Sequence, residues 1–109
     1  MMQKEIVLLP YPFSDMKGKK VRPALVVSNN NFNVRSNDCI MVPLTSVIKD
    51  EPHSILIDQD DLASGKLHSI SRVKADKIFT VEKKIAIMKI GILNDGPFEK
   101  IRSEILKIL

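Results

Sequence analysis

Short runs of β-branched and other apolar residues, separated by Pro, Gly, Asn and Asp, recur along most of the chain. Runs of this length and composition are typical of β-strands. No long helical pattern lies between successive runs, which favours an antiparallel sheet or a small barrel over βαβ units. Several runs are almost continuously apolar, which indicates strands that are covered on both faces. The predicted strands are 5–9, 23–28, 39–44, 54–57, 71–81 and 84–90.

One helix is predicted at the C-terminal end of the chain. Asn94 or Asp95 suits its N-cap, and Pro97 suits its first turn. Apolar side chains then recur at helical spacing and form one stripe, which we expect to pack on the sheet. The stripe consists of Phe98, Ile101, Ile105 and Ile108. Elsewhere, the segment 60–66 begins with acidic residues and has a Gly near its end, which predicts only a single helical turn.

The composition fits one globular domain, which we expect to be cytoplasmic. At 109 residues the chain is too short for two independent cores. The single cysteine, Cys39, lies in an apolar run, which excludes an internal disulfide and a Cys-rich zinc site. The first apolar stretch is broken by Pro10 and is too short for a signal peptide or a membrane span. The net charge of +4 favours anionic partners such as nucleic acid or an acidic protein.

Four cations cluster between the first two predicted strands, in the stretch SDMKGKKVRP. Most such charge runs are solvated loops, and Lys17, Lys19 and Lys20 fit that interpretation. Arg22 differs from them because Pro23 pushes the preceding residue into extended backbone, which restricts where the guanidinium points. A fixed and permanently charged fork suits the recognition of a phosphate.

Two further segments carry polar side chains near the ends of predicted strands. The stretch VPLTS presents Thr45 and Ser46, whose hydroxyls most often form turns with their own backbone. In SRVKADKIFT, the side chains of Arg72, Lys74 and Asp76 alternate along the chain and are expected to share one face of a strand. A carboxylate between cations is often only a surface ion pair.

The histidines and the absence of familiar motifs restrict the chemistry. His53 and His68 are the only histidines, and their spacing matches no histidine metal motif, so we expect neither a metal nor a cofactor. His68 has a side chain that can act as an acid or a base near neutral pH, although a lone loop histidine is more often a spectator. The chain has no phosphate-binding Gly loop, no GxSxG motif and no Cys/His pair.

Three stretches of the chain, taken in order, resemble the MazF/PemK family of toxins from bacterial and archaeal toxin–antitoxin pairs. They are EIVLLPYPFSDMKGKKVRPALVVS, VPLTS and SRVKADKIFTVEKK. The resemblance covers nearly the whole chain. Two departures stand out: the family's Gly-Asp opening is Lys4-Glu5 here, and its frequent Gln is Lys77. The resemblance implies a mainly β fold, a small SH3-like antiparallel barrel with a C-terminal helix, of the MazF/PemK/CcdB-like kind.

The resemblance also implies an activity and partners. Members of the family are sequence-specific endoribonucleases that cut single-stranded RNA without a metal, form homodimers, and are bound by an acidic antitoxin with which they bind DNA. The 2′-hydroxyl of the RNA attacks the adjacent phosphate, which leaves a 2′,3′-cyclic phosphate and a 5′-hydroxyl.

Carried over residue by residue, the resemblance assigns roles within the site. Arg22 and Thr45 match the arginine and threonine at the scissile phosphate, and Asp76 matches an acidic position proposed as the general base. Lys74 stands where those members have a basic general acid. Apart from the resemblance, Lys20 is an alternative proton donor, and Phe13 or Tyr11 is available to stack on a base. The predicted substrate-binding residues are Phe13, Lys19, Lys20, Ser46, Lys74 and Lys77.

Two other functions remain open at this point. The same barrel serves toxins that bind DNA gyrase and have no nuclease activity, so the fold alone does not decide function. A gyrase binder has no need of the set Arg22, Thr45 and Asp76. A catalytically inactive barrel that binds nucleic acid or protein is the other alternative, and it differs from a ribonuclease in that it never turns over RNA.

Overall fold

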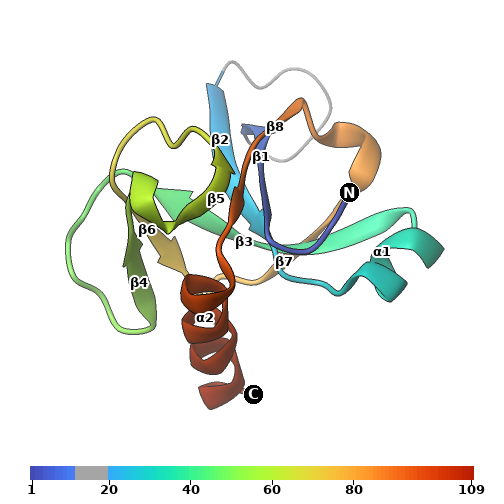
Figure 1. Cartoon of the computed structure of the whole chain (residues 1–109). Coiled ribbons are helices and arrows are strands. Elements are labelled where there is room, and N and C mark those ends of the chain that lie inside the picture. Colours follow the sequence, from blue (N-terminus) through green and yellow to red (C-terminus); the bar gives the residue numbers. More distant parts are fainter. Residues whose placement is uncertain (12–19) are drawn as a thin grey trace.

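The computed structural model describes residues 1–11 and 20–109, without the side chain of Tyr11 (Figure 1). The predicted RNA contacts Phe13 and Lys19 lie outside the described residues. The strands are β1 (Glu5–Tyr11), β2 (Lys20–Val26), β3 (Asp38–Thr45), β4 (Ser54–Ile57), β5 (Leu62–Gly65), β6 (Ser71–Lys74), β7 (Phe79–Glu82) and β8 (Met88–Leu93). The helices are α1 (Asn30–Arg35) and α2 (Asp95–Lys107), with 3₁₀ turns η1 (Gln59–Asp61) and η2 (Lys83–Ile85).

The strands form one curled antiparallel sheet, a half-barrel with α2 beside its open side (Figure 1). Their order across the sheet is β4-β6-β3-β2-β1-β8-β5, and β7 pairs with the same β3 that pairs with β6. This arrangement confirms the predicted fold class, which is mainly β with a C-terminal helix. In the described part of the chain, no helix is long and apolar enough to cross a membrane.

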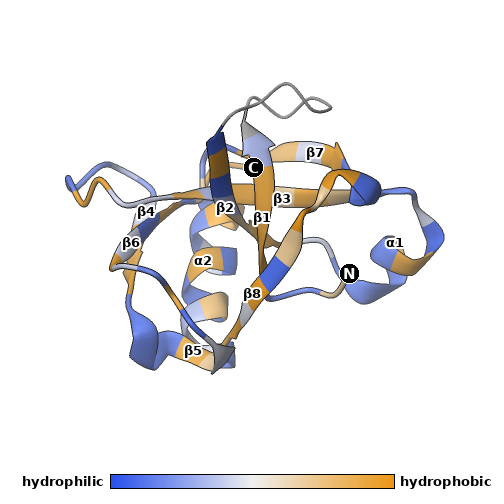
Figure 2. Ribbon diagram, turned by 90° about the horizontal axis from the view of Figure 1, so that it is seen from above, coloured by the Kyte–Doolittle hydropathy of each residue, from blue (hydrophilic) through white to orange (hydrophobic). Residues whose placement is uncertain are grey.

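Alternation along the central strands gives the sheet two apolar faces, as the near-continuous apolar runs predict. In β1, Ile6 packs with Phe98 and Ile101 of α2, while its neighbour Val7 packs on the opposite face with Met41. All five side chains are at most 2% exposed. Figure 2 shows how strongly apolar β1 and β3 are. Side chains in the middle of the sheet are therefore buried on both faces, and a functional site is expected at the strand ends and loops.

The predicted C-terminal helix is confirmed. Asn94 stands at its N-cap position, Phe98 and Ile101 are buried, and Ile105 packs against the same core. Ile108 is 38% exposed, so the buried stripe is shorter than the sequence predicts.

The predicted strand 71–81 is interrupted in the structure. Leu44 lies opposite Val73 and Met41 lies opposite Phe79, so β6 and β7 both pair with β3 but are separated by a turn that β3 does not match. The amide N–H of Lys77 donates to the Lys74 carbonyl at 3.1 Å within this turn. Asp76 therefore lies in a turn and does not continue the face that Arg72 and Lys74 share.

The predicted helical turn over 60–66 is mostly wrong. The turn η1 is capped earlier, by Asp58, and the chain then becomes β5, which pairs with β8. Gly65 has φ +85°, and a Cβ there would lie 2.3 Å from the Ile90 carbonyl oxygen. The glycine is thus required by the close approach of two strands, which local sequence does not distinguish from a helix stop.

Helix α1 is not predicted from the sequence, because NNNFNVR is rich in residues typical of loops. Asn29 caps it by accepting the Phe32 amide N–H at 2.8 Å. Asn33 is buried, and its side-chain amide donates to the Ser28 carbonyl at 2.9 Å, while the Ser28 hydroxyl donates to the Asn33 side-chain oxygen. This buried pair supplies the stabilisation that helix propensity does not.

Candidate functional site

Arg22 and Thr45 lie at neighbouring ends of β2 and β3. The β2–β3 ladder ends where Ala24 lies opposite Pro43, and Arg22 and Thr45 are each two residues further along their strands. Side chains alternate along a strand, so both belong to the face that carries Ala24 and Pro43. The register of the sheet therefore brings together two residues that are 23 positions apart in the sequence.

Thr45 begins a turn as well as ending a strand. Its Oγ1 accepts the amide N–H of Val47 at 3.1 Å, which fixes the hydroxyl oxygen within the turn. A hydroxyl that accepts in this way still has its own proton to donate. Thr45 can therefore serve both as the turn former that the sequence indicates and as a hydrogen-bond donor to a ligand.

A cavity of about 860 Å³ lies at these strand ends and unites most of the predicted site. Of the predicted residues, Arg22, Thr45, Ser46, Lys74 and Lys77 line it. They come from β2, β3, β6 and the turns after β3 and β6. A guanidinium, two ammonium groups and two hydroxyls around one cavity are chemically suited to a phosphate-bearing ligand.

Two predicted residues within the described chain do not line this cavity. Lys20 is exposed at the start of β2. Asp76 lies in the turn after β6, where its Oδ2 is 3.8 Å from Nζ of Lys77 and its side chain is 34% exposed. The turn thus directs Lys74 and Lys77 to the cavity and leaves the carboxylate between them outside it.

The loop between β5 and β6 contributes residues that the sequence analysis did not place in the site. Lys66, His68 and Ser69 line the cavity, together with Ser71 at the start of β6. Periodicity gives no signal for them, because their position depends on the pairing of β5 with β8. A polar loop that contains a histidine was the one available indication.

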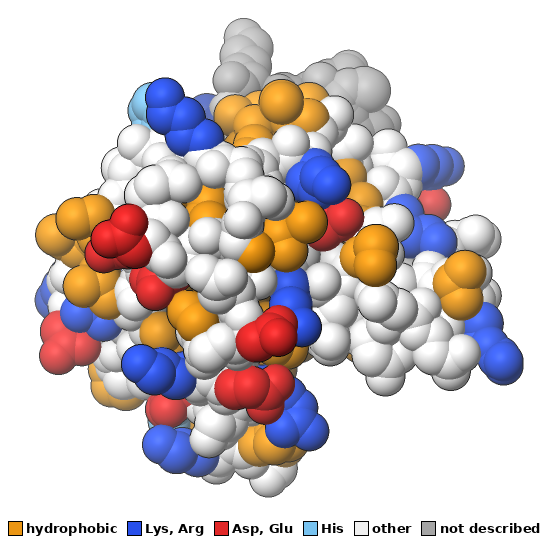
Figure 3. Space-filling model, viewed as in Figure 1, with side chains coloured by type: hydrophobic (Ala, Val, Ile, Leu, Met, Phe, Trp, Pro, Cys, Tyr) orange, Lys and Arg blue, Asp and Glu red, His pale blue; other side chains and the backbone are white. Residues whose placement is uncertain are grey.

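The charge lining the cavity has one sign. Arg22, Lys66, Lys74 and Lys77 are its charged residues, and no carboxylate lines it within residues 1–11 and 20–109. Over α2, by contrast, acidic and basic side chains are mixed (Figure 3). The cavity is therefore a better place for an anion than the helix surface on that side of the molecule.

The resolved pKa shifts lie away from this cavity. Burial raises the pKa of the Cys39 thiol, whose residue is fully buried. The hydrogen bond from His53, and then that from Lys107, lowers the pKa of the Glu104 carboxyl. Neither group lines the cavity, so neither shift bears on the candidate site.

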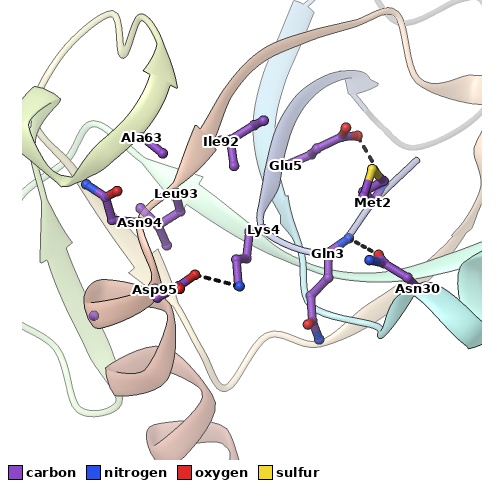
Figure 4. Close-up of a pocket in the computed structure, with 11 residues that line it drawn as sticks. Met2, Gln3, Lys4, Glu5, Asn30, Ala63, Ile92, Leu93, Asn94 and Asp95 are labelled. Carbon is purple, nitrogen blue, oxygen red and sulfur yellow. Dashed lines mark hydrogen bonds and ion pairs between the residues drawn. The ribbon is translucent and has the colours of Figure 1, made fainter.

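A second cavity, of about 630 Å³, lies between the N-terminal residues and the start of α2 (Figure 4). Lys4, Glu5 and Asp95 line it, and Lys4 Nζ is 2.6 Å from Asp95 Oδ1. The carboxylate of Glu5 accepts the Met2 amide N–H at 3.1 Å. Glu5 Oε2 also lies 3.7 Å from Nζ of Lys89, so all three charged groups already have partners, and none of the predicted site residues lines this cavity.

Within the described residues, no three His, Cys, Asp or Glu side chains are grouped so that they could hold a metal ion.

The sequence of this chain matches a known protein family. A family model for the PemK-like, MazF-like toxin of type II toxin-antitoxin systems matches residues 2–109. Among curated proteins, no similar sequence was found.

Several solved structures share the fold. An endoribonuclease in complex with its cognate antitoxin from a mycobacterial species is 21% identical, with a TM-score of 0.79 over 98% of this chain and 92% of that chain. MazE-MazF from Deinococcus radiodurans is 20% identical, with a TM-score of 0.78 over 99% and 94%. The Mycobacterium tuberculosis toxin MazF-mt6 is 17% identical, with a TM-score of 0.74 over 94% and 93%.

Proposed function

Because this chain belongs to the PemK-like, MazF-like toxins of type II toxin–antitoxin systems, we propose that it is an endoribonuclease that cuts single-stranded RNA in the cavity lined by Arg22 and Thr45. The observation that carries the proposal is the convergence of Arg22, Thr45 and Lys74 on one cavity that has cationic and no acidic lining among the described residues.

RNA brings its own nucleophile, since the 2′-hydroxyl can attack the adjacent phosphorus and displace the 5′-oxygen. The products are a 2′,3′-cyclic phosphate and a 5′-hydroxyl. The protein has to accept the 2′-hydroxyl proton, supply a proton to the leaving 5′-oxygen and stabilise the charge on the phosphorane-like transition state. A metal is not needed for any of these steps, and we propose that the reaction is metal-independent.

Each of the three residues has a part in this scheme. The guanidinium of Arg22 donates to two non-bridging oxygens and stabilises their charge. The hydroxyl of Thr45, held by the Val47 amide N–H, donates to a non-bridging oxygen. The ammonium of Lys74 supplies the proton to the 5′-oxygen. The sequence predicts Asp76 as the general base, but Asp76 does not line the cavity, so these three residues leave the base unassigned.

The remaining predicted residues would bind the substrate. Ser46 and Lys77 line the cavity and contact the backbone on either side of the cut. Lys20 lies outside it on β2, where it can follow the RNA backbone further from the cut. Unpaired bases can be splayed out and stacked on aromatic side chains, which favours a single strand over a duplex.

We also propose the partners that go with this activity. An acidic segment of a cognate antitoxin would compete with RNA for the same cations, because its carboxylates are anions like the RNA phosphates. The toxin would act as a homodimer in the cytoplasm, and the toxin–antitoxin complex would bind DNA.

The experiment is to incubate the purified protein, free of antitoxin, with a long single-stranded RNA of mixed sequence in EDTA. We expect discrete cuts whose downstream fragments carry a 5′-hydroxyl and accept phosphate from a kinase without prior dephosphorylation. Intact RNA from the folded protein would contradict the proposal and favour a binding module that does not turn over.

A further inference from the structure

His68 lines the cavity in which we place RNA cleavage, although it has no part in the scheme above. We propose that His68 is a further catalytic residue, the general base that accepts the proton of the 2′-hydroxyl, and that Asp76 does not have this role. This inference rests on the proposed ribonuclease function and specifies one step of it.

The composition of the lining singles out His68. Guanidinium and ammonium groups are hydrogen-bond donors only, and hydroxyls are weak bases. Because no carboxylate lines the cavity in residues 1–11 and 20–109, the imidazole is the one described lining side chain with a basic nitrogen lone pair that can accept the proton. The side chain is exposed, so a substrate that enters the cavity can reach it.

The backbone on both sides of His68 is fixed. Before it, the amide N–H of Leu67 donates to Gln59 Oε1 at 2.7 Å, and Gln59 Nε2 donates to the Gly65 carbonyl at 3.1 Å. The side chain of Leu67 is buried in the core. After it, the hydroxyl of Ser71 donates to the Ser69 carbonyl at 2.9 Å.

An exposed loop histidine with no function needs no such support. Here the two neighbours of His68 are held by a buried side chain and by side-chain hydrogen bonds, while His68 itself is exposed and lines the cavity. Groups that are held in place before the substrate binds lose less entropy in the reaction.

The charged groups that line the cavity with His68 are all cations. They are Arg22 on β2, Lys66 on the same loop, Lys74 on β6 and Lys77 in the turn that follows. None of them competes for the 2′-hydroxyl proton, and together they can hold the phosphate next to the imidazole. Asp76, by contrast, is outside the lining and lies beside the ammonium of Lys77.

In the proposed step, His68 accepts one proton and Lys74 donates one. A nitrogen of neutral His68 takes the proton of the 2′-hydroxyl as the 2′-oxygen forms its bond to phosphorus. The bond from phosphorus to the 5′-oxygen breaks, and that oxygen takes a proton from the ammonium of Lys74. Afterwards His68 returns its proton to solvent and Lys74 takes one up.

The test compares the pH dependence of single-turnover cleavage among matched variants. The substrate is an oligonucleotide that spans one mapped cut of the wild-type protein. His68→Ala and Asp76→Asn separate the two candidate bases, and His53→Gln is the control because His53 is the other histidine and does not line the cavity.

We expect His68→Ala to lower the cleavage rate by about 100-fold or more, the usual range for a lost acid–base group. We also expect the rise of the rate with pH through the neutral range to disappear, and added imidazole to restore part of the rate. Binding of the same oligonucleotide with a 2′-deoxy sugar at the cut should be unchanged. Asp76→Asn and His53→Gln should keep the wild-type pH profile.

Three results would overturn the assignment. A His68→Ala variant with the wild-type rate and pH profile would show that the imidazole is a spectator, while wild-type cleavage would still support the proposed function. Loss of the pH-dependent rise in Asp76→Asn instead would return the role to Asp76. Full rescue of His68→Ala by a substrate with a 5′-thio leaving group, which needs no protonation, would make His68 the acid.

Discussion

Arg72 lies opposite Thr45 in the β3–β6 ladder, and its guanidinium reaches the loop that follows Thr45. Its Nε donates to the Ile48 carbonyl at 3.2 Å, and its Nη1 donates to the Ser54 hydroxyl at 3.3 Å. The Arg72 side chain is only 17% exposed. One residue of β6 thus ties both ends of the loop between β3 and β4 to the sheet, directly beside the candidate site.

Replacing Arg72 should therefore loosen the turn at Thr45. In Arg72→Ala we expect faster hydrogen exchange of the Val47 amide, whose acceptor is Thr45 Oγ1 at 3.1 Å, with a several-fold fall in RNA cleavage. Arg72→Lys should not restore protection, because an ammonium cannot reproduce the two directed hydrogen bonds of the guanidinium fork. Hydrogen exchange followed by NMR measures the protection.

The control for this prediction is Asp50→Ala. Asp50 Oδ1 lies 3.5 Å from Arg72 Nη1, but the Asp50 side chain is 88% exposed, so the pair contributes little to stability. Unchanged protection of Val47 in Arg72→Ala would show that the loop holds its shape without the arginine.

Lys4 has a backbone conformation that favours glycine. Its φ is +79°, and the conformation is locked because its N–H donates to the Val26 carbonyl and its carbonyl accepts the Leu93 N–H, both at 2.9 Å. The resemblance places the family's glycine here. The Lys4 side chain makes two contacts that offset the cost of this conformation. Its Nζ forms the ion pair with Asp95 shown in Figure 4 and lies 5.7 Å from the centre of the Phe98 ring.

Two substitutions at this position separate the backbone from the side chain. Lys4→Gly and Lys4→Ala both lose the contacts to Asp95 and Phe98, but only glycine relieves the positive φ. We expect Lys4→Gly to be more stable than Lys4→Ala by about 1 kcal/mol in urea unfolding. Equal stability of the two variants would mean that the positive φ is not strained.

His53 and Glu104 join the start of β4 to α2. His53 Nδ1 lies 3.0 Å from Glu104 Oε1, and this hydrogen bond, followed by that of Lys107, lowers the pKa of the Glu104 carboxyl. A carboxyl whose pKa is lower in the folded state stabilises the fold above its unfolded pKa. That contribution is lost as the pH falls through the folded value.

The prediction is a pH-dependent difference between the wild type and Glu104→Gln. Thermal unfolding should show the wild type as the more stable protein at neutral pH, with the difference shrinking as the pH falls below about 4, near the ordinary pKa of a glutamate. In a His53→Gln background the same substitution should matter less. A difference that does not change with pH would rule out a contribution from the ionisation of Glu104.

The fold was predictable where the pattern is local. The apolar runs predict the central strands, and the stripe through Phe98 and Ile101 predicts α2, because each pattern reflects one buried face. The misplaced elements depend on contacts between distant residues. Gly65 marks a close approach to Ile90, and α1 depends on the buried pair of Ser28 and Asn33, so no short stretch of sequence reveals either.

The site was predictable only in part, for a related reason. Arg22 and Thr45 stand out by type and by family resemblance, and the structure brings them to one cavity with Lys74. The turn after β6 keeps Asp76 out of that cavity, although strict alternation would have kept it on the face of Lys74. His68 enters only through the pairing of β5 with β8, which the sequence pattern does not predict.

The most direct test of the central claim is the single-turnover rate of RNA cleavage in EDTA by Arg22→Ala. The matched control is Arg35→Ala, because Arg35 is an exposed arginine on α1 that does not line the cavity. If the cavity is the site of cleavage, Arg22→Ala should lose at least about 100-fold in rate, the usual effect of removing one preorganised donor, and Arg35→Ala should keep the wild-type rate. Cleavage by a folded Arg22→Ala variant at the wild-type rate would contradict the claim and place the chemistry elsewhere.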